Sequence, residues 1–137
     1  MKIQITGIGS YIPALKIHNT DFDKHVFLNE DGSAFAYPND VVISKFKGIT
    51  GIEQRRYAED HLNSSDLAFF ASEKAIEDAK IDPETIDYII YAHNFGDVNH
   101  GTIQTDTLPS LATRVKNKLQ IKNPKCVAYG ILFGCPG

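Results

Sequence analysis

The chain has 137 residues, of which 42% are hydrophobic and 23% charged, and its formal net charge is −3. This composition is ordinary for a globular protein, so it excludes a disordered chain, and the acidic balance excludes a basic nucleic-acid surface. No apolar run approaches the roughly 20 residues that cross a bilayer, and residues 1–5 alternate polar and apolar side chains, unlike a signal peptide. We therefore expect a cytoplasmic protein without nucleic-acid or membrane partners.

Predicted strands and helices alternate along the chain. Runs of alternating or continuous apolar residues predict strands at 3–9, 52–58, 86–92 and 126–132. Helical spacing and capping residues predict helices at 40–47, 65–80 and 108–119. They also predict a helix that starts at 19–22, with Phe22, Val26 and Phe27 at helical spacing, and a single turn that starts at 82–84. Pro13 closes the first strand and Gly48 ends the first helix, whereas Cys126 lies among apolar neighbours and is predicted to be a core residue.

This alternation indicates the fold class. Strands separated by helical stretches of such length imply a mostly parallel sheet with helices packed on it. The sequence contains no repeat, low-complexity tract or linker. We predict one α/β domain over residues 1–137.

The most informative chemical feature is Cys135. An apolar run over residues 127–133 leads into Gly134, Cys135 and Pro136, so a predicted strand meets a glycine turn and the cysteine falls where a helix should begin. Unpaired N–H groups and the macrodipole at a helix N-terminus favour a thiolate. Because the sequence stops at Gly137, we interpret it as the front half of a thiol-dependent enzyme, cut just after its nucleophile. A buried structural cysteine is the alternative.

Several ordered segments carry a family resemblance. They are ITGIGSYIP at 5–13, GITGIEQRR at 48–56, SDLA at 65–68, IDYIIY at 86–91 and the cysteine at 135. This order and spacing resembles the N-terminal half of β-ketoacyl-acyl carrier protein synthase III, a thiolase-like condensing enzyme, over essentially the whole chain. The resemblance implies half of a five-layered αβαβα sandwich, with a mostly parallel mixed sheet flanked by helices, and a homodimer.

The resemblance also implies a reaction. Cys135 would accept an acyl group as a thioester, which then condenses with malonyl-acyl carrier protein as carbon dioxide is lost, in fatty-acid or related biosynthesis. Cysteine suits thioester exchange, and backbone N–H groups at the turn can stabilise the oxyanion. The family's histidine and asparagine lie in its C-terminal half, so we expect this chain alone to be inactive. Acyl-CoA or acyl-carrier-protein thioesters are the implied substrates, with no cofactor or metal.

Two departures from the family pattern concern the substrate. Phe133 and Gly134 replace the usual alanine-rich lead into the cysteine, and the bulky Phe133 would narrow the acyl pocket. CoA-dependent members hold adenine between a tryptophan and an arginine, whose places fall here at Lys45 and Ile49, and the chain has no tryptophan. This favours a carrier-protein-bound acyl donor over free CoA.

Other polar residues have two interpretations each. Arg55 matches the arginine of the family segment and is a candidate substrate-binding residue, through a carrier-protein phosphate or acidic helix, with an ion pair inside the fold as the alternative. Lys116 and Lys118, with two neighbouring lysines, form either a solvated face or a carrier-docking surface. The loop from His93 to residue 104 is better explained by turn chemistry, dimer contacts or pocket lining than by a metal site.

Two other functions stay open from the sequence alone. A thiolase-like relative that does not decarboxylate, such as an acyltransferase or a hydroxymethylglutaryl-CoA synthase-like enzyme, would use the same cysteine. A non-catalytic dimerisation module would not use it.

Overall fold

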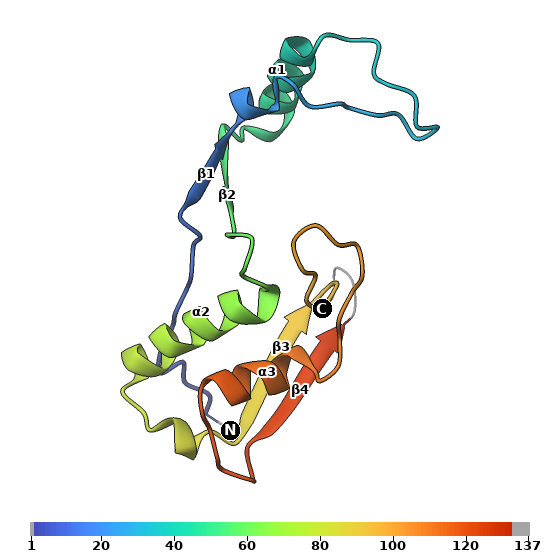
Figure 1. The fold of residues 1–137 in the computed structure, drawn as a ribbon. Helices are drawn as coiled ribbons and strands as arrows, with labels where there is room; N and C mark the ends of the chain where they lie inside the picture. Colours follow the sequence, from blue (N-terminus) through green and yellow to red (C-terminus); the bar gives the residue numbers. More distant parts are fainter. Residues whose placement is uncertain (1, 133–137) are drawn as a thin grey trace. The chain divides into compact units, whose positions relative to one another are not determined.

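The computed structural model describes residues 2–132, so Cys135, Phe133 and Gly134 lie outside the described residues. The described chain divides into two compact units (Figure 1). The sheet–helix unit contains residues 2–12 and 59–132, and the hairpin unit contains residues 13–58. The division into units does not test whether residues 1–137 form a single domain, and that expectation stays a prediction.

The sheet–helix unit is built on two parallel strands. β3 (Tyr88–His93) pairs with β4 (Val127–Leu132), in a register that runs from Tyr88 opposite Val127 to His93 opposite Leu132. Its helices are α2 (Ser64–Ala79) and α3 (Leu111–Lys118), with a 3-10 turn, η2, at Pro83–Thr85. These helices and the parallel pairing confirm the predicted α/β class.

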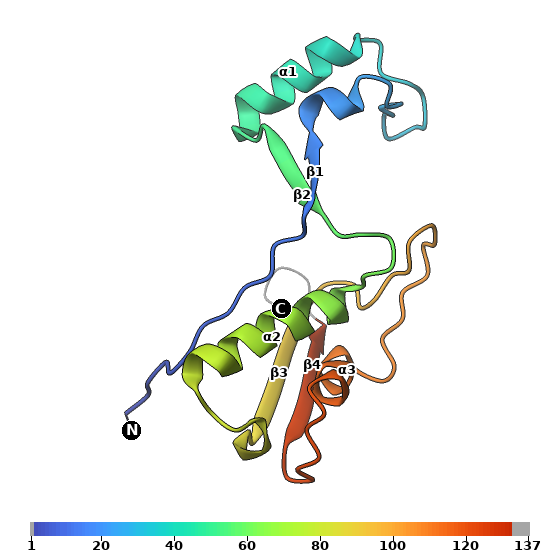
Figure 2. The ribbon, with the colours of Figure 1, turned by 60° about the vertical axis from the view of Figure 1, so that its left-hand side comes forward.

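The core of this unit lies between α3 and the strands. Leu111 and Val115 on α3 are almost fully buried, together with Cys126 just before β4, which confirms the predicted core role of that cysteine. α2 and α3 lie over the same face of the strand pair (Figure 2). On this face the Tyr91 hydroxyl of β3 bonds to Ser64, the first residue of α2. Burial of these apolar side chains is the main stabilising term for the unit.

The other face of the strand pair is open among the described residues. Side chains at alternate positions point to opposite faces of a strand, so every second residue of β3 and β4 lies there. They include Tyr88, Ile90, Tyr129 and Ile131, with exposed fractions of 41–64%. The rings of Tyr88 and Tyr129 stack with their centroids 6.3 Å apart.

Gly130 is the point of closest approach between β4 and the start of α3. A Cβ atom added at Gly130 would lie 3.1 Å from the Cβ of Ser110, the N-cap residue of α3. Contacts of that length are tighter than ordinary van der Waals packing, so a residue without a side chain fits best there.

Residues 3–9 do not form the predicted strand. They run along α2, where the Ile8 N–H donates to the Asp78 carboxylate at 2.9 Å and Lys74 donates to the Ser10 carbonyl. Gly7 and Gly9 allow this close approach, because a Cβ atom at either position would collide with the backbone of α2. Alternation alone is not sufficient for a strand: its N–H and C=O groups need a partner strand, and the described residues pair none with this segment.

The hairpin unit joins an antiparallel strand pair to one helix. β1 (Leu15–His18) pairs with β2 (Gln54–Tyr57), and η1 (Asn19–Phe22) follows β1 directly. α1 (Asn39–Thr50) is longer than predicted and passes through Gly48. It ends at Gly51, whose φ of 68° is the left-handed conformation that terminates helices and whose N–H bonds to the Lys47 carbonyl.

No helix within residues 2–132 combines the length and the apolar character needed to cross a bilayer.

Candidate functional site

The carboxyl ends of β3 and β4 meet at one edge of the strand pair. His93 ends β3 and pairs with Leu132, the last residue of β4. Cys135 follows Leu132 by three positions in the sequence. In parallel sheets ligands bind beyond the carboxyl ends of the strands, so this edge is the candidate functional site.

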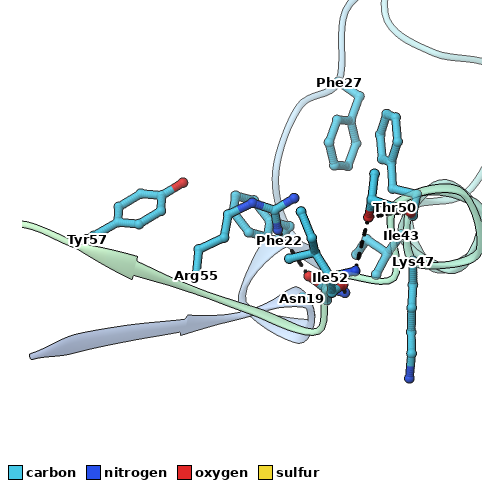
Figure 3. A pocket seen from close by; sticks show the side chains of 10 residues that line it. Asn19, Phe22, Phe27, Ile43, Lys47, Thr50, Ile52, Arg55 and Tyr57 are labelled. Atoms are coloured by element: carbon cyan, nitrogen blue, oxygen red, sulfur yellow. Dashed lines mark hydrogen bonds between the residues drawn. The ribbon is translucent and has the colours of Figure 1, made fainter. Parts of the chain in front are cut away.

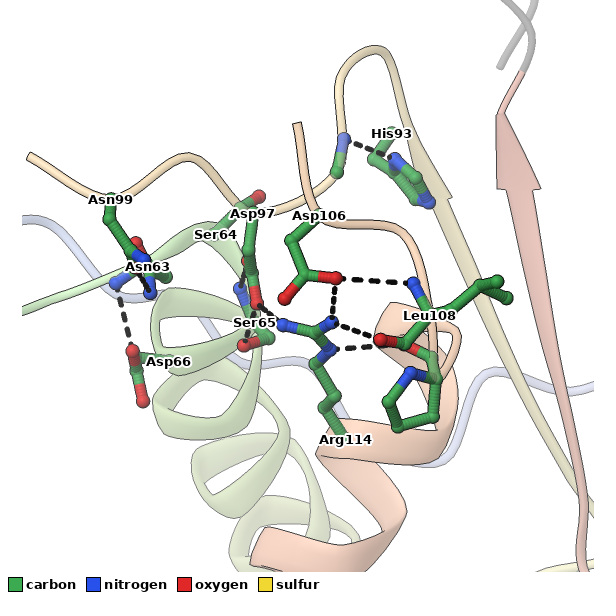
Figure 4. Close-up of polar contacts among 12 residues, drawn as sticks. Asn63, Ser64, Ser65, Asp66, His93, Asp97, Asn99, Asp106, Leu108 and Arg114 are labelled. Atoms are coloured by element: carbon green, nitrogen blue, oxygen red, sulfur yellow. Dashed lines mark hydrogen bonds and ion pairs between the residues drawn. The ribbon is translucent and has the colours of Figure 1, made fainter. Parts of the chain in front are cut away.

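A buried carboxylate fixes the loop that leaves β3 at this edge. Asp97 is only 2% exposed, and it accepts three hydrogen bonds (Figure 4). The Ser65 N–H donates at 2.8 Å, the Ser65 hydroxyl at 2.6 Å and the Arg114 guanidinium at 2.9 Å. Because Ser65 lies in the first turn of α2 and Arg114 lies in α3, the Asp97 side chain connects the loop to both helices.

Arg114 carries the second half of this network. Its guanidinium contacts Asp106 at 2.8 Å and donates to the carbonyls of Leu108 and Pro109, both at 3.0 Å. The hydrogen bond from Arg114 holds the pKa of Asp106 below its ordinary value, and the same bond raises the pKa of Arg114. Backbone hydrogen bonds between Asp97 and Asp106, at 2.8 and 3.0 Å, close the loop on itself.

The imidazole of His93 is also held in place. Its Nδ1 accepts the Gly96 N–H at 2.9 Å, so the neutral ring carries its proton on Nε2. Gly96 has a φ of 82°, and a Cβ there would lie 2.7 Å from the Asp106 carbonyl oxygen. This is the turn chemistry predicted for the loop, and no group of three or more metal-ligating side chains occurs within residues 2–132.

The network of Asp97, Asp106 and Arg114 was not predictable from any sequence motif. Asp97 stands in a polar loop, where aspartate ordinarily caps a turn and faces water. Its burial depends on a contact with Arg114, 17 residues further along the chain. Spacing within the loop could not reveal this partner.

Two of the lysines expected on a solvated face have partners inside the fold. The Lys116 ammonium donates to the Asn123 and Cys126 carbonyls at 2.9 and 2.7 Å, which braces the turn between α3 and β4. Lys118 pairs with Asp66 at 2.6 Å. Burial disfavours the charge on Asp66, but hydrogen bonds from Lys118 and the Asn63 N–H outweigh it and lower the pKa of the carboxyl.

Arg55 lies in β2 of the hairpin unit. It donates to the Asn19 side-chain oxygen at 3.2 Å and lines a cavity of about 240 Å³ (Figure 3). No carboxylate of the described residues lies within ion-pair distance of its guanidinium, so the structure does not contain the internal ion pair considered from the sequence.

Lys45 and Ile49 lie on an exposed stretch of α1. Together with Phe35 and Tyr37 they line a separate groove of about 420 Å³ within the hairpin unit. The two aromatic rings come from the loop before α1. Aromatic side chains therefore do occur beside Lys45, although the tryptophan of the CoA-dependent pattern is absent.

Comparisons with known proteins agree with the sequence motifs. A beta-ketoacyl-acyl-carrier-protein synthase III of Staphylococcus haemolyticus is 37% identical over 137 residues, which is 100% of this chain and 36% of that protein. A synthase III of Vibrio cholerae is 34% identical over the same shares. The homologues of this chain are thus β-ketoacyl-acyl carrier protein synthase III proteins. No family model matches it.

Solved structures of the synthase III family support the same relationship. The 3-oxoacyl-acyl-carrier-protein synthase III of Aquifex aeolicus is 27% identical, with a TM-score of 0.67, and the match covers 98% of this chain and 36% of that one. The α/β arrangement described above is thus part of a thiolase-like fold. The chain spans 36% of the length of the curated synthase III relatives it matches first.

Proposed function

We propose that the protein containing this chain is a decarboxylating condensing enzyme that uses Cys135 as its nucleophile. The observation that supports this most is the 34–37% identity to synthase III proteins along all 137 residues. The parallel strands add to it, because β4 ends at the sheet edge where ligands bind in α/β folds, and Cys135 follows three residues later in the sequence.

The proposed reaction has two steps. The Cys135 thiolate attacks the carbonyl of an acyl thioester, a new sulfur–carbon bond forms, and the donor thiol leaves. A malonyl thioester on acyl carrier protein then loses its carboxylate as carbon dioxide, and the resulting carbanion displaces Cys135 from the acyl group. Backbone N–H groups beside the cysteine would stabilise the oxyanion in each attack. No cofactor is consumed in this sequence.

The proposal extends to the surroundings of Cys135. Phe133 and Gly134 would contact the acyl group, with Phe133 limiting the length of chain accepted. Acyl carrier protein is the proposed partner, and the working form is a cytoplasmic homodimer that includes the histidine and asparagine of the family. Arg55 is proposed to contact a ligand.

The test is intact-mass spectrometry on the protein at its full natural length, incubated with a panel of acyl-CoA and acyl-carrier-protein donors. We expect a mass gain of one acyl group, which a Cys135→Ala variant does not show, and preference for carrier-protein donors. Release of carbon dioxide during turnover with malonyl-acyl carrier protein separates this reaction from a non-decarboxylating acyltransferase. No acyl adduct with any donor would contradict the proposal.

A further inference from the structure

The cavity around Arg55 combines apolar walls with one positive charge. Its apolar walls come from η1, the loop that follows it, α1 and the segment between α1 and β2, and they are the side chains of Phe22, Phe27, Ile43, Phe46 and Ile52. These residues all belong to the hairpin unit, so the cavity is complete within one compact part of the chain.

Most of the hydrogen-bond donors of the Arg55 side chain are unused in this cavity. A guanidinium has five N–H groups, and the single hydrogen bond that the structure shows for Arg55 goes to Asn19. Arg55 is half-buried and has no anionic partner within residues 2–132, which is unusual because burial of a charge is favourable only when the charge is paired. The adjacent Arg56 differs: it is exposed and donates to the carbonyls of Pro13 and Ala14.

The charge of the cavity favours a carboxylate over a phosphate. Lys47 also borders the cavity, but its ammonium pairs with Glu53 at 2.8 Å and its side chain points away from the others (Figure 3). Of the two cations that line this cavity, Arg55 is therefore the one without a carboxylate partner among the described residues. One guanidinium matches one carboxylate through two parallel hydrogen bonds, whereas a phosphate dianion would keep part of its charge unpaired.

The size of the cavity limits the apolar part of the ligand. Pockets for drug-sized molecules have volumes of about 300–1,000 Å³, and this cavity of about 240 Å³ is smaller. A short alkyl chain or a single ring would fill it, and the aromatic walls suit either.

We propose that the cavity around Arg55 binds a small monocarboxylate with an apolar body, whose carboxylate pairs with the Arg55 guanidinium. This site does not depend on condensation at Cys135. A protein that loads no acyl group on Cys135 would still bind the carboxylate at Arg55. The experiments can therefore refute the condensation reaction and the carboxylate site independently of each other.

Isothermal titration calorimetry with sodium hexanoate, on the protein at its full natural length, tests the site. Hexanoate is expected to bind, whereas acetate lacks the apolar body and 1-hexanol lacks the charge, so each should bind at least about tenfold more weakly. Hexyl phosphate is the fourth probe. Binding of hexyl phosphate or hexanol as tight as that of hexanoate would overturn the assignment to a carboxylate.

Three variants place the binding in the cavity. Arg55→Gln should weaken hexanoate about ten- to a hundredfold, since a charge-assisted pair is lost, while the matched Arg56→Gln should leave it unchanged. Ile52→Trp, which fills the cavity without removing the charge, should also weaken binding, and it serves if Arg55→Gln does not fold. Hexanoate bound elsewhere, including an acyl site beside Cys135, would be insensitive to Arg55→Gln and Ile52→Trp, and that result would overturn the proposal.

Discussion

Replacing Asp97 by alanine should destabilise the sheet–helix unit more than any other loss of a single loop side chain. The substitution removes the acceptor of three hydrogen bonds, two from Ser65 and one from Arg114. It leaves the Ser65 N–H and hydroxyl buried without a partner, and it takes away one of the two carboxylates beside Arg114.

The expected loss in the free energy of unfolding follows from the burial of the ion pair between Asp97 and Arg114. Removing one partner of a buried ion pair costs about 3–5 kcal/mol. Arg114 is 18% exposed and keeps its contact with Asp106, so we expect the lower end, about 3 kcal/mol in the free energy of unfolding. Asp97→Asn retains one acceptor oxygen for Ser65 and should lose less.

Urea unfolding followed by far-ultraviolet circular dichroism measures this difference. Hydrogen exchange at the Ser65 amide adds a local readout, and exchange there should accelerate in the variant. Asp106→Ala is the matched control: it removes the other carboxylate beside Arg114, but 57% of the Asp106 side chain is exposed, so the loss should be smaller. A loss below about 1 kcal/mol for Asp97→Ala, or an equal loss in both variants, would refute the reasoning.

Three further predictions concern stability. Leu111→Ala should cost about 3 kcal/mol in urea unfolding, because the side chain is fully buried and leaves a cavity; a cost typical of a surface site would contradict its core position. Gly9→Ala should lower the free energy of unfolding by about 1–3 kcal/mol, because the added methyl group collides with the backbone of α2. Gly48→Ala in α1 is the matched control, since its methyl group meets no atom within 4 Å, and it should be neutral or stabilising. Equal thermal unfolding temperatures for the two variants would refute the close approach at Gly9. Asp66 should stabilise the fold at pH values above its ordinary pKa near 3.8, and this contribution should be lost as the pH falls through the lower pKa of the folded state. Asp66→Asn should therefore reduce the loss of stability at acid pH. An unchanged loss at acid pH would argue against the contact with Lys118.

The helices and the parallel strands were predictable because local signals and packing agree there. The caps and helical spacing of residues 64–79 and 111–118 coincide with buried stripes, and the apolar runs at 88–93 and 127–132 pair in the structure. The end of α1 was predicted at Gly48 and lies at Gly51, since the glycine that terminates a helix is the one that adopts positive φ. Because Gly48 and Gly51 are only three residues apart, the local sequence does not show which of them terminates the helix.

The candidate site was predictable in part. The family motifs and the strand that precedes Cys135 were visible in the sequence, and the homologues of this chain are synthase III proteins. The assembly of Asp97 and Arg114 was not visible, because it joins residues from separate elements and depends on their packing. The cavity around Arg55 is of the same kind: the arginine was a candidate, but its apolar surroundings come from residues spread between Phe22 and Tyr57.

Gly130 also has a consequence for how the strands find each other during folding. A slip of one residue between β3 and β4 exchanges the two faces of β4 and would bring Tyr129 or Ile131 to the place beside Ser110 where Gly130 now lies. With only 3.1 Å between Ser110 and an added Cβ, neither large side chain fits. The absence of a side chain at Gly130 therefore disfavours a one-residue slip and helps to select the observed register between β3 and β4.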